Sequence, residues 1–398
     1  MDFYIADALQ VLMQNWNPDF NRLVMSFFWL IPMVVVVVVI AYFLTGLRKM
    51  SPTFFSILRA ILIIAYLAKF MVFGVLLLDD ARLLTMGIIE RFAGNLGFEY
   101  GRSQFVAALA ILMGMIPFVT LTYGMIRNRH RYKVFKETIS VKNLPKNLNG
   151  LRIVQISDIH SGSFTMKEPV KLAIEMINAQ KADLVFFTGD LVNHIADEMD
   201  NFTDVFDKIK SKYGVFSILG NHDYGDYVNW ESPMAKQQNL EKLKGIHKQM
   251  GWDLLLNENR LLPINGEEVA IIGVENYSES PRFSKYGDLA KAYEGSEKAG
   301  LKLLLSHDPT HWEGQVLQKF KDIAITFSGH THGMQFGIEF GKFFKWRPAK
   351  YIYKQWAGLY RKGTQYLYVN RGFGFLGYPG RVGILPEITV IELENKEE

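Results

Sequence analysis

Cysteine is absent from the 398 residues of this chain. The protein therefore has no disulfide bonds and no thiolate for catalysis or metal binding, which is compatible with a reducing compartment. A strong charge of either sign is also missing, because 44 Lys and Arg residues face 40 Asp and Glu residues, a formal net charge of +4. This mild excess suits attraction to anionic surfaces and argues against a nucleic-acid-binding protein. The N-terminus lacks the basic start and the small-residue cleavage site of a signal peptide, so we expect none.

Charged residues are missing from long stretches near the front of the chain. None occurs between Arg22 and Arg48, and residues 34–39 are all valine. Such a run is long enough to span a bilayer, which needs about 20 apolar residues. We therefore expect a membrane region at residues 23–128, preceded by a short extramembrane segment at residues 1–22.

Two further apolar stretches complete the expected membrane region with about three transmembrane helices. Residues 54–78 and 103–126 each fit one helix. The charged residues between them, 79–102, suggest an extramembrane amphipathic loop or a short re-entrant piece. Lys69 lies closer to the middle of the second helix, where an unpaired charge is costly. It either reaches the interface in a tilted helix or pairs with Glu90.

A basic cluster directly after the third apolar stretch sets the expected orientation. Its members are Arg127, Arg129, Arg131, Lys133 and Lys136. Basic clusters at membrane boundaries favour the cytoplasmic side. Arg48 and Lys49 after the first stretch agree with three helices running out-to-in, in-to-out and out-to-in. We therefore expect a multi-pass protein of the cell membrane whose domain at residues 129–398 lies in the cytoplasm.

Residues 129–398 predict a layered α/β domain. Short apolar runs alternate with stretches of helical spacing at residues 168–179 and 201–211. Residues 134–141 are typical of an edge strand. Residues 151–156 are mostly β-branched and predict a short strand within a covered sheet.

Five of the predicted strands end in side chains that can bind metals. These side chains are Asp158 and His160, Asp190, Asn221 to Asp223, His307, and His330 and His332. Open sheets place their sites at the carboxyl ends of strands. Asp158 and His160 are two residues apart, so in extended backbone both project to the same side, where they can share one divalent cation.

This set of strand ends resembles the calcineurin-like metallophosphoesterases. The matching blocks are Asp158-x-His160, Gly189-Asp190, Gly220-Asn-His-Asp223, Ser306-His307 and Gly329-His-Thr-His332. The chain is most similar to the membrane-associated branch of that family, whose last block reads Gly-His-Thr-His-Gly-Gly-Gln. Here Met334 stands where glycine is usual.

The resemblance implies two divalent metal ions, Mn, Fe or Zn, and assigns their ligands. Asp190 would bridge the two ions. Asp158, His160 and His332 would complete the first site, and Asn221, His307 and His330 the second. A hydroxide bridging the ions would be the nucleophile, and the ions would clamp the attacking and leaving oxygens of an in-line displacement.

The resemblance also assigns roles beyond the metal ligands. His222 would donate a proton or hydrogen bond to the departing oxygen. Asp223 either orients the His222 imidazole or caps its turn. Arg371, in a block that resembles the end of the family pattern, would meet a substrate phosphate. Asp308 and His311 match no ligand position, and we expect them in loops.

Residues 340–362 interleave basic and aromatic residues. This composition suits an anionic lipid interface, and the alternative is ordinary packing of the aromatic residues beneath a solvated basic face. Membrane lipids and a phosphorylated substrate are the partners that we expect.

Taken together, these features predict a membrane-anchored, dinuclear metal-dependent phosphoesterase. We expect it to hydrolyse a phosphate ester or pyrophosphate bond of an amphiphilic, lipid-linked substrate. One alternative is a membrane-tethered hydrolase of soluble nucleotides. The other is a non-catalytic membrane sensor or scaffold, which would have no need of the full set of metal ligands.

Overall fold

The computed structural model describes residues 1–45, 52–97, 100–340 and 344–395. Arg48 and Lys49, on which the predicted membrane orientation partly rests, lie outside the described residues. The chain divides into two compact units, Met1–Ile126 with Gly377–Pro379, and Arg127–Leu376 with Gly380–Glu398.

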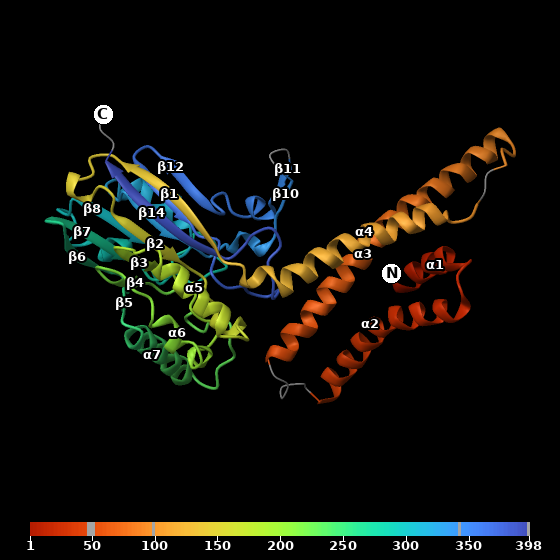
Figure 1. Cartoon of the computed structure of the whole chain (residues 1–398), viewed down its shortest axis with the longest axis horizontal. Helices are drawn as coiled ribbons and strands as arrows, with labels where there is room; N and C mark the ends of the chain where they lie inside the picture. The colour runs from red at the N-terminus through yellow and green to blue at the C-terminus, as the bar shows by residue number, and fades with distance from the viewer. Residues whose placement is uncertain (46–51, 98–99, 341–343, 396–398) are drawn as a thin grey trace. The chain divides into compact units, whose positions relative to one another are not determined.

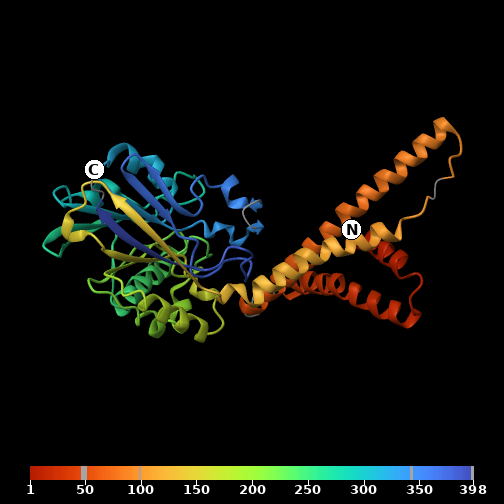
Figure 2. The same cartoon turned by 45° about the horizontal axis from the view of Figure 1, so that its top comes forward.

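The N-terminal unit is helical. Its helices are α1 Asp2–Met13, α2 Pro18–Thr45, α3 Pro52–Ala93 and α4 Gln104–Ile126. Helices α3 and α4 pack against each other (Figures 1 and 2). Three stretches are long and apolar enough to cross a membrane, namely Pro18–Ala41, Ile57–Ala93 and Gln104–His130. Three apolar helices of this kind were predicted.

Helix α3 is longer than predicted. The sequence suggested a loop or a re-entrant piece at residues 79–102, but α3 continues to Ala93. Part of the charge that indicated a loop is satisfied within the helix, because Arg82 Nε donates to Asp79 Oδ1 at 2.8 Å, one turn away. The chain leaves the helix at Gly94, whose φ of 85° is typical of a helix C-terminus.

The N-terminal helix α1 packs onto α3 and α4. Its buried face contributes to an apolar cluster made of Ile5, Ala8, Val72, Leu76, Ala107 and Ala110. Lys69 of α3 is paired with this helix, because its Nζ lies 2.6 Å from Asp2 Oδ1. Of the two alternatives for Lys69, pairing with Glu90 is therefore wrong, because its partner Asp2 comes from the segment that was expected to lie outside the membrane region.

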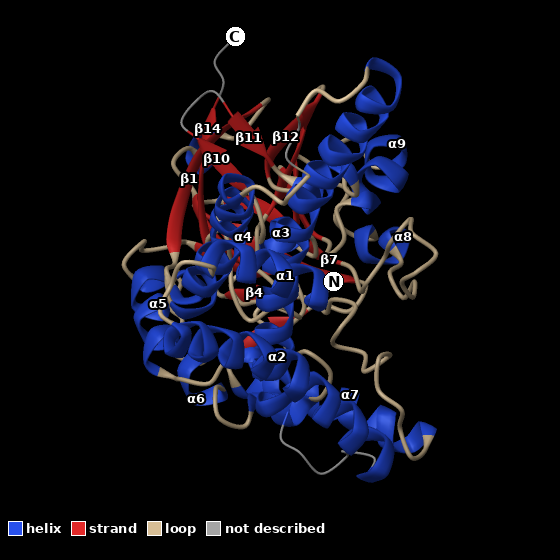
Figure 3. Cartoon of the chain, turned by 90° about the vertical axis from the view of Figure 1, so that its right-hand side faces the viewer, coloured by secondary structure: helices blue, strands red, loops and turns tan. Residues whose placement is uncertain are grey.

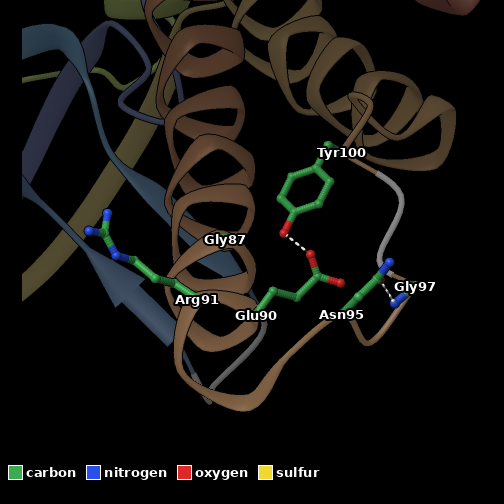
Figure 4. Close-up of a pocket in the computed structure, with 6 residues that line it drawn as sticks. All are labelled: Gly87, Glu90, Arg91, Asn95, Gly97 and Tyr100. Carbon is green, nitrogen blue, oxygen red and sulfur yellow. Dashed lines mark hydrogen bonds between the residues drawn. The ribbon is translucent and has the colours of Figure 1, made fainter.

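Glu90 instead belongs to a pocket of about 720 Å³ at the far end of α3. There its carboxylate accepts a hydrogen bond from the Tyr100 hydroxyl (Figure 4). The pocket is lined by Gly87, Glu90, Arg91, Asn95, Gly97 and Tyr100.

The C-terminal unit contains two six-stranded sheets (Figures 1 and 3). The first has the order β1-β14-β2-β3-β4-β5, and the second the order β12-β13-β9-β8-β7-β6. The strands of the first sheet are β1 Lys133–Val141, β2 Arg152–Ile156, β3 Leu184–Phe187, β4 Val215–Ser217, β5 Trp252–Leu254 and β14 Glu387–Asn395. Those of the second are β6 Glu258–Ile264, β7 Glu267–Gly273, β8 Leu301–Leu305, β9 Ile325–Ser328, β12 Gly358–Lys362 and β13 Gln365–Val369. A separate hairpin consists of β10 Ile338–Phe340 and β11 Phe344–Trp346.

The two sheets pack face to face, with helices on their outer faces. The core between the sheets includes the buried side chains of Ile153, Phe186, Ile271, Leu303 and Phe327. The outer face of the first sheet is covered by α5 Glu168–Asn178, α6 Thr203–Phe206 and α7 Pro233–Gln249. That of the second is covered by α8 Leu289–Tyr293 and α9 Leu317–Lys319. This architecture confirms the predicted layered α/β domain, with β1 at a sheet edge.

One predicted helix is much shorter than expected. Residues 201–211 have helical spacing, but α6 ends at Phe206. The Asn178 side chain of α5 donates to the Lys208 carbonyl at 2.9 Å and accepts from the Lys210 N–H at 2.8 Å. Because the side chain binds these backbone groups, they are not left to continue the helix.

Candidate metal centre

The predicted metal ligands follow strands of both sheets. In the first sheet, Asp158 and His160 follow β2, Asp190 follows β3 and Asn221 follows β4; in the second, His307 follows β8, and His330 and His332 follow β9. Strands β2, β3 and β4 are parallel to one another, as are β8 and β9. Their carboxyl ends therefore meet at one edge of each sheet.

The acidic and histidine side chains form two buried or half-buried groups. In each group the ligand atoms lie within 4.8 Å of one another, and the groups are Asp158, His160 and His332, and Asp190, His307 and His330. Each group takes residues from both sheets. The groups can therefore form only when the two sheets are packed together.

The first group has the spacing of ligands that share one cation. His332 Nε2 lies 3.0 Å from His160 Nε2 and 3.3 Å from Asp158 Oδ1. Two atoms bound to the same ion at about 2.0–2.2 Å lie roughly 3.0–3.5 Å apart. The residues present therefore fit a divalent cation.

The second group has the same spacing and gains an amide oxygen. His330 Nδ1 lies 3.2 Å from His307 Nε2. Asn221 Oδ1 lies 2.8 Å from His330 Nδ1 and 3.2 Å from His307 Nε2. Two imidazole nitrogens and a neutral oxygen therefore converge on one point, as in a site for a borderline divalent metal.

Asp190, a member of the second group, also lies close to the first group. Its Oδ2 is 3.5 Å from His160 Nε2 and 3.3 Å from His307 Nε2. Its Oδ1 accepts the backbone N–H of His222 at 2.8 Å. Oδ2 therefore faces ligands of both groups, while the hydrogen bond from the His222 backbone to Oδ1 fixes the orientation of the carboxylate.

The backbone of these ligands is unusual. Five non-glycine ligands have left-handed φ values, namely Asp158 at 52°, His160 at 49°, Asp190 at 61°, His330 at 70° and His332 at 50°. Each such residue costs about 1–3 kcal/mol, and this kind of strain concentrates at functional sites. Met334, in the position where the family pattern has glycine, also has a positive φ, 53°.

Neighbouring glycines allow the strand ends to approach closely. A Cβ on Gly220 would lie 2.3 Å from Asp190 Oδ1, and one on Gly329 would lie 2.3 Å from Asp158 Oδ2. Both distances are far below van der Waals contact. The glycines of the motifs are therefore needed for the packing of the carboxylates.

Burial and mutual charge set the protonation of the site. Burial raises the pKa of Asp158 to about 6 and lowers that of His160 to about 3. For His307, burial alone lowers the pKa, but the Asp190 carboxylate outweighs it and raises the pKa to about 10. In return, His307 and His222 overcome the effect of burial and hold the pKa of Asp190 well below its usual value. Binding of a cation at His307 must release its proton.

His222 is held by a backbone carbonyl and not by Asp223. Its Nδ1 lies 2.7 Å from the Asn193 carbonyl oxygen. The Asp223 carboxylate instead accepts the N–H groups of Asp190, Leu191, Val192 and Gly220 at 2.8–3.2 Å. The predicted orienting contact is therefore not formed. Because Asp223 is fully buried, its carboxylate turns inward to the backbone donors around it.

Three further residues support the ligands and were not predicted to do so. Tyr353 Oη and Asp308 Oδ2 lie 3.0 Å and 3.6 Å from His330 Nε2. Asn221 Nδ2 donates to Tyr227 Oη at 2.9 Å. Such contacts orient metal ligands. The place of Asp308 directly after His307 could have suggested its role, whereas Tyr353 and Tyr227 carry no signal in the sequence.

The Arg371 guanidinium is bound by residues outside the two ligand groups. Its Nη1 donates to Glu387 Oε2 at 2.5 Å, and its guanidinium lies 4.6 Å from the centre of the Phe135 ring. The next residue, Gly372, borders the centre, since a Cβ there would lie 3.0 Å from His332 Nδ1. The fully buried Arg381 donates to the Gly372 carbonyl at 3.0 Å. The contact between Arg371 and a phosphate at the metals stays a prediction.

The segment 340–362 is only partly a surface feature. Residues 341–343, including Lys342, lie outside the described residues. Lys354 and Lys362 both form ion pairs with Glu313. Trp356 is buried, and its backbone carbonyl accepts a hydrogen bond from the Thr331 hydroxyl at 2.6 Å. Thr331 stands in the sequence between two histidines of the centre, His330 and His332.

Comparison with known proteins gives the family. A model described as "Probable Calcineurin-like phosphoesterase, transmembrane domain" matches residues 1–129, and one described as "Calcineurin-like phosphoesterase" matches residues 151–334. The chain belongs to the calcineurin-like phosphoesterases, a family of metal-dependent enzymes that hydrolyse phosphoester bonds. With its three apolar helices, it is a membrane protein.

Several similar proteins carry names of the same kind. The chain is 28% identical over 340 residues to "Transmembrane protein with metallophosphoesterase domain" of Danio rerio, covering 83% of this chain and 74% of that protein. It is 27% identical over 314 residues to the Bos taurus protein of the same name, covering 76% and 66%. It is 28% identical over 280 residues to "Uncharacterized metallophosphoesterase YkuE" of Bacillus subtilis, covering 69% and 90%.

Proposed function

We propose that this protein is a membrane-anchored phosphoesterase that works with two divalent cations, Mn, Fe or Zn. Asp158, His160 and His332 would hold the first cation, and Asn221, His307 and His330 the second. The observation that carries the proposal is the position of Asp190 Oδ2, 3.5 Å from His160 Nε2 and 3.3 Å from His307 Nε2. A carboxylate oxygen in this position suits a bridge between two cations.

The cations, when bound, would supply electrophilic activation of phosphate oxygens and of water. The residues of the chain would then position the reactants. His222 has its Nδ1 fixed by the Asn193 carbonyl, which leaves Nε2 as the nitrogen to give a proton to the departing oxygen. Proton transfer of this kind contributes about 10²–10⁴-fold to the rate. Asp223 would act as a positioning residue, through the backbone of the loop that carries Asp190.

An amphiphilic, lipid-linked phosphate ester is the substrate class that we favour, because the catalytic domain follows a set of apolar helices in the sequence. The basic cluster at residues 127–136 supports a cytoplasmic domain. A membrane-tethered hydrolase of soluble nucleotides is the second candidate. Mono- and diester reporters, soluble nucleotides and lipid extracts, tested with the same purified protein and added manganese, separate these substrate classes.

Replacement of the proposed bridge tests the two-metal assignment. In Asp190→Asn we expect loss of activity and of bound metal in a protein that remains folded. A neutral amide carries no negative charge to offset the repulsion between the two cations, so it is a poor bridge. Metal content per chain, turnover of a nitrophenyl ester and thermal unfolding are measured on full-length protein in detergent. Asp204→Asn, which changes an exposed carboxylate bound to Lys167, is the matched control. Full activity with two bound metals in Asp190→Asn would refute the assignment.

A further inference from the structure

A loop beside the candidate metal centre contributes none of the proposed metal ligands. It comprises residues 274–288, between β7 and α8. Asn276 closes the base of this loop, because its side chain donates to the Ser284 carbonyl at 2.8 Å and its backbone carbonyl accepts the Tyr286 N–H at 2.8 Å. Asn276 is buried, so water does not compete for these bonds. The bonds therefore restrain the residues between them.

The loop is fastened to the segment that follows β4. The Tyr286 ring stacks on the Tyr224 ring, and the two ring centres lie 4.0 Å apart. The Tyr286 hydroxyl donates to Asp226 Oδ2 at 3.0 Å. The same segment carries the proposed ligand Asn221 and the proposed proton donor His222. The loop therefore keeps a fixed place relative to these two residues.

The tip of the loop contacts the second ligand group. The Phe283 ring lies nearly perpendicular to the His330 ring, at an angle of 87°, and the two ring centres are 4.7 Å apart. Edge-to-face contacts of this kind are favourable between rings. Arg282 directly precedes Phe283, so its backbone lies beside the same group, and its side chain is exposed. An exposed cation in this place can contact a molecule that approaches the centre.

The charge of Arg282 acts on two tyrosines that flank the second group. Burial raises the pKa of both Tyr227 and Tyr353, and Arg282 acts against the rise in each case. The Tyr353 hydroxyl lies 3.0 Å from His330 Nε2. The centre of the Tyr227 ring lies 4.7 Å from that of the His222 ring. Arg282 therefore brings positive charge to the side of the centre where His222 is proposed to give its proton.

The acidic side chains of this region are bound to other cations. Glu279 Oε2 lies 3.8 Å from Lys285 Nζ. Asp226 Oδ1 lies 2.5 Å from Lys236 Nζ. In the part of the chain that the structure describes, no carboxylate forms an ion pair with Arg282. Its guanidinium is therefore available to an anionic ligand.

The metal centre would attract such a ligand to the same place. Asp158 and Asp190 are the carboxylates of the two ligand groups, and together they would offset only half of the charge of two divalent cations. A guanidinium beside this surplus of positive charge is repelled, and an anion bound between them removes the repulsion. A phosphate at the centre, in contact with Arg282, is an anion of this kind.

The chemistry of phosphate esters decides which ligand gains most from this guanidinium. A monoester has three unesterified oxygens and up to two negative charges, whereas a diester has two such oxygens and one charge. Guanidinium groups bind these oxygens through paired N–H donors. The additional oxygen and charge of a monoester therefore make its contact with a guanidinium stronger.

We propose that Arg282 binds an unesterified oxygen of the substrate phosphate, and that this contact makes phosphomonoesters the preferred substrates of the centre. The inference rests on the proposed two-metal phosphoesterase and narrows its substrate class. A lipid phosphate and the phosphate of a soluble alcohol share this chemistry, so the experiment includes both sources.

The experiment compares Arg282→Gln with the unmodified full-length protein in uncharged detergent with added manganese. The measurements are metal content, calorimetric binding of inorganic phosphate, and kcat and KM for nitrophenyl phosphate, a monoester, and bis(nitrophenyl) phosphate, a diester. We expect Arg282→Gln to keep its manganese and to weaken phosphate binding about tenfold or more, because a hydrogen bond between charged groups is lost. The value of kcat/KM should fall by a similar factor for the monoester and clearly less for the diester.

Two variants serve as controls. Lys285→Gln removes one positive charge from the same loop, at a side chain that is bound to Glu279, and should change phosphate binding less than about twofold. Arg282→Lys should retain part of the affinity, because it keeps the charge without the paired donors. For the source of the phosphate, the unmodified protein is given a short-chain phosphatidic acid and glycerol 1-phosphate. A higher kcat/KM for the phosphatidic acid assigns a lipid, and a higher value for glycerol 1-phosphate assigns a soluble ester.

Three results would overturn the proposal. Arg282→Gln could bind phosphate as tightly as the unmodified protein or as Lys285→Gln does, it could lose kcat/KM equally for the two esters, or it could lose its manganese, which would show a structural role. Failure of the proposed function has a different signature, since the unmodified protein would then bind no manganese and hydrolyse neither ester.

Discussion

Asp223→Asn should destabilise the catalytic domain strongly, although the two side chains have nearly the same shape. The carboxylate accepts four backbone N–H groups, two at each oxygen, from Asp190, Leu191, Val192 and Gly220. An asparagine keeps one acceptor oxygen and turns a donor toward the other two N–H groups. Each buried donor left without a partner costs about 1–3 kcal/mol, so the loss should be about 2–6 kcal/mol.

This loss should lower the Tm of the catalytic domain by roughly 5–20 °C. The measurement is thermal unfolding of the full-length protein in detergent at pH 8. Burial and the Asp190 charge raise the pKa of Asp223 to about 7, so the carboxylate is charged under this condition. Manganese binding is measured in parallel. It should weaken, because the loop whose N–H groups Asp223 accepts carries the proposed metal ligand Asp190.

Two variants make the result interpretable. Asp223→Ala removes all of the acceptors and should unfold at a still lower temperature than Asp223→Asn. Asp204→Asn, at an exposed position, should unfold as the unmodified protein does. If Asp223→Asn keeps the original Tm and the original manganese affinity, the backbone bonds to this carboxylate do not stabilise the loop and the reasoning is wrong.

Two further predictions concern the proton donor and the membrane unit. His222→Ala should retain both metals and lower kcat about 10²–10⁴-fold, with a smaller loss for a nitrophenyl ester than for an alkyl ester; equal losses for the two leaving groups would argue against proton donation. Asp2→Asn should destabilise the helical unit by about 3 kcal/mol, because it leaves the charge of Lys69, whose side chain is 9% exposed, without its carboxylate. Adding Lys69→Met should recover most of that loss in detergent unfolding, whereas strictly additive effects would contradict the pairing.

Much of the fold could be predicted because it is encoded locally. The apolar runs that become β2, β3, β4, β8 and β9 are each bounded by turn residues, and their ends carry the side chains of the two ligand groups. Parallel strands bring such ends together without further information. The three apolar helices follow in the same way from composition and length.

The errors came from partners that are distant in the sequence. Helix α3 continues through charged residues because its acids find bases elsewhere, as Asp80 does with Arg102 at 2.9 Å. Lys69 is paired with Asp2, a residue in a segment that its mixed composition placed outside the membrane region. Tyr353 supports His330 although its neighbours suggested a lipid-facing surface. None of these contacts has a periodic signal in the sequence.

The place of strand β14 has a consequence for how the protein is made. This strand lies between β1 and β2, with Lys133 opposite Glu387 on one side and Ile153 opposite Ile391 on the other (Figure 1). Strand β1, which continues from the apolar helices, therefore joins its sheet through a segment that the ribosome releases more than two hundred residues later. Until β14 has been synthesised, the nascent domain attached to the apolar helices lacks a strand from the interior of its first sheet. A premature stop codon before residue 387 would leave the ligand residues in the chain but disconnect β1 from β2, so quality control should treat such a product as unfolded.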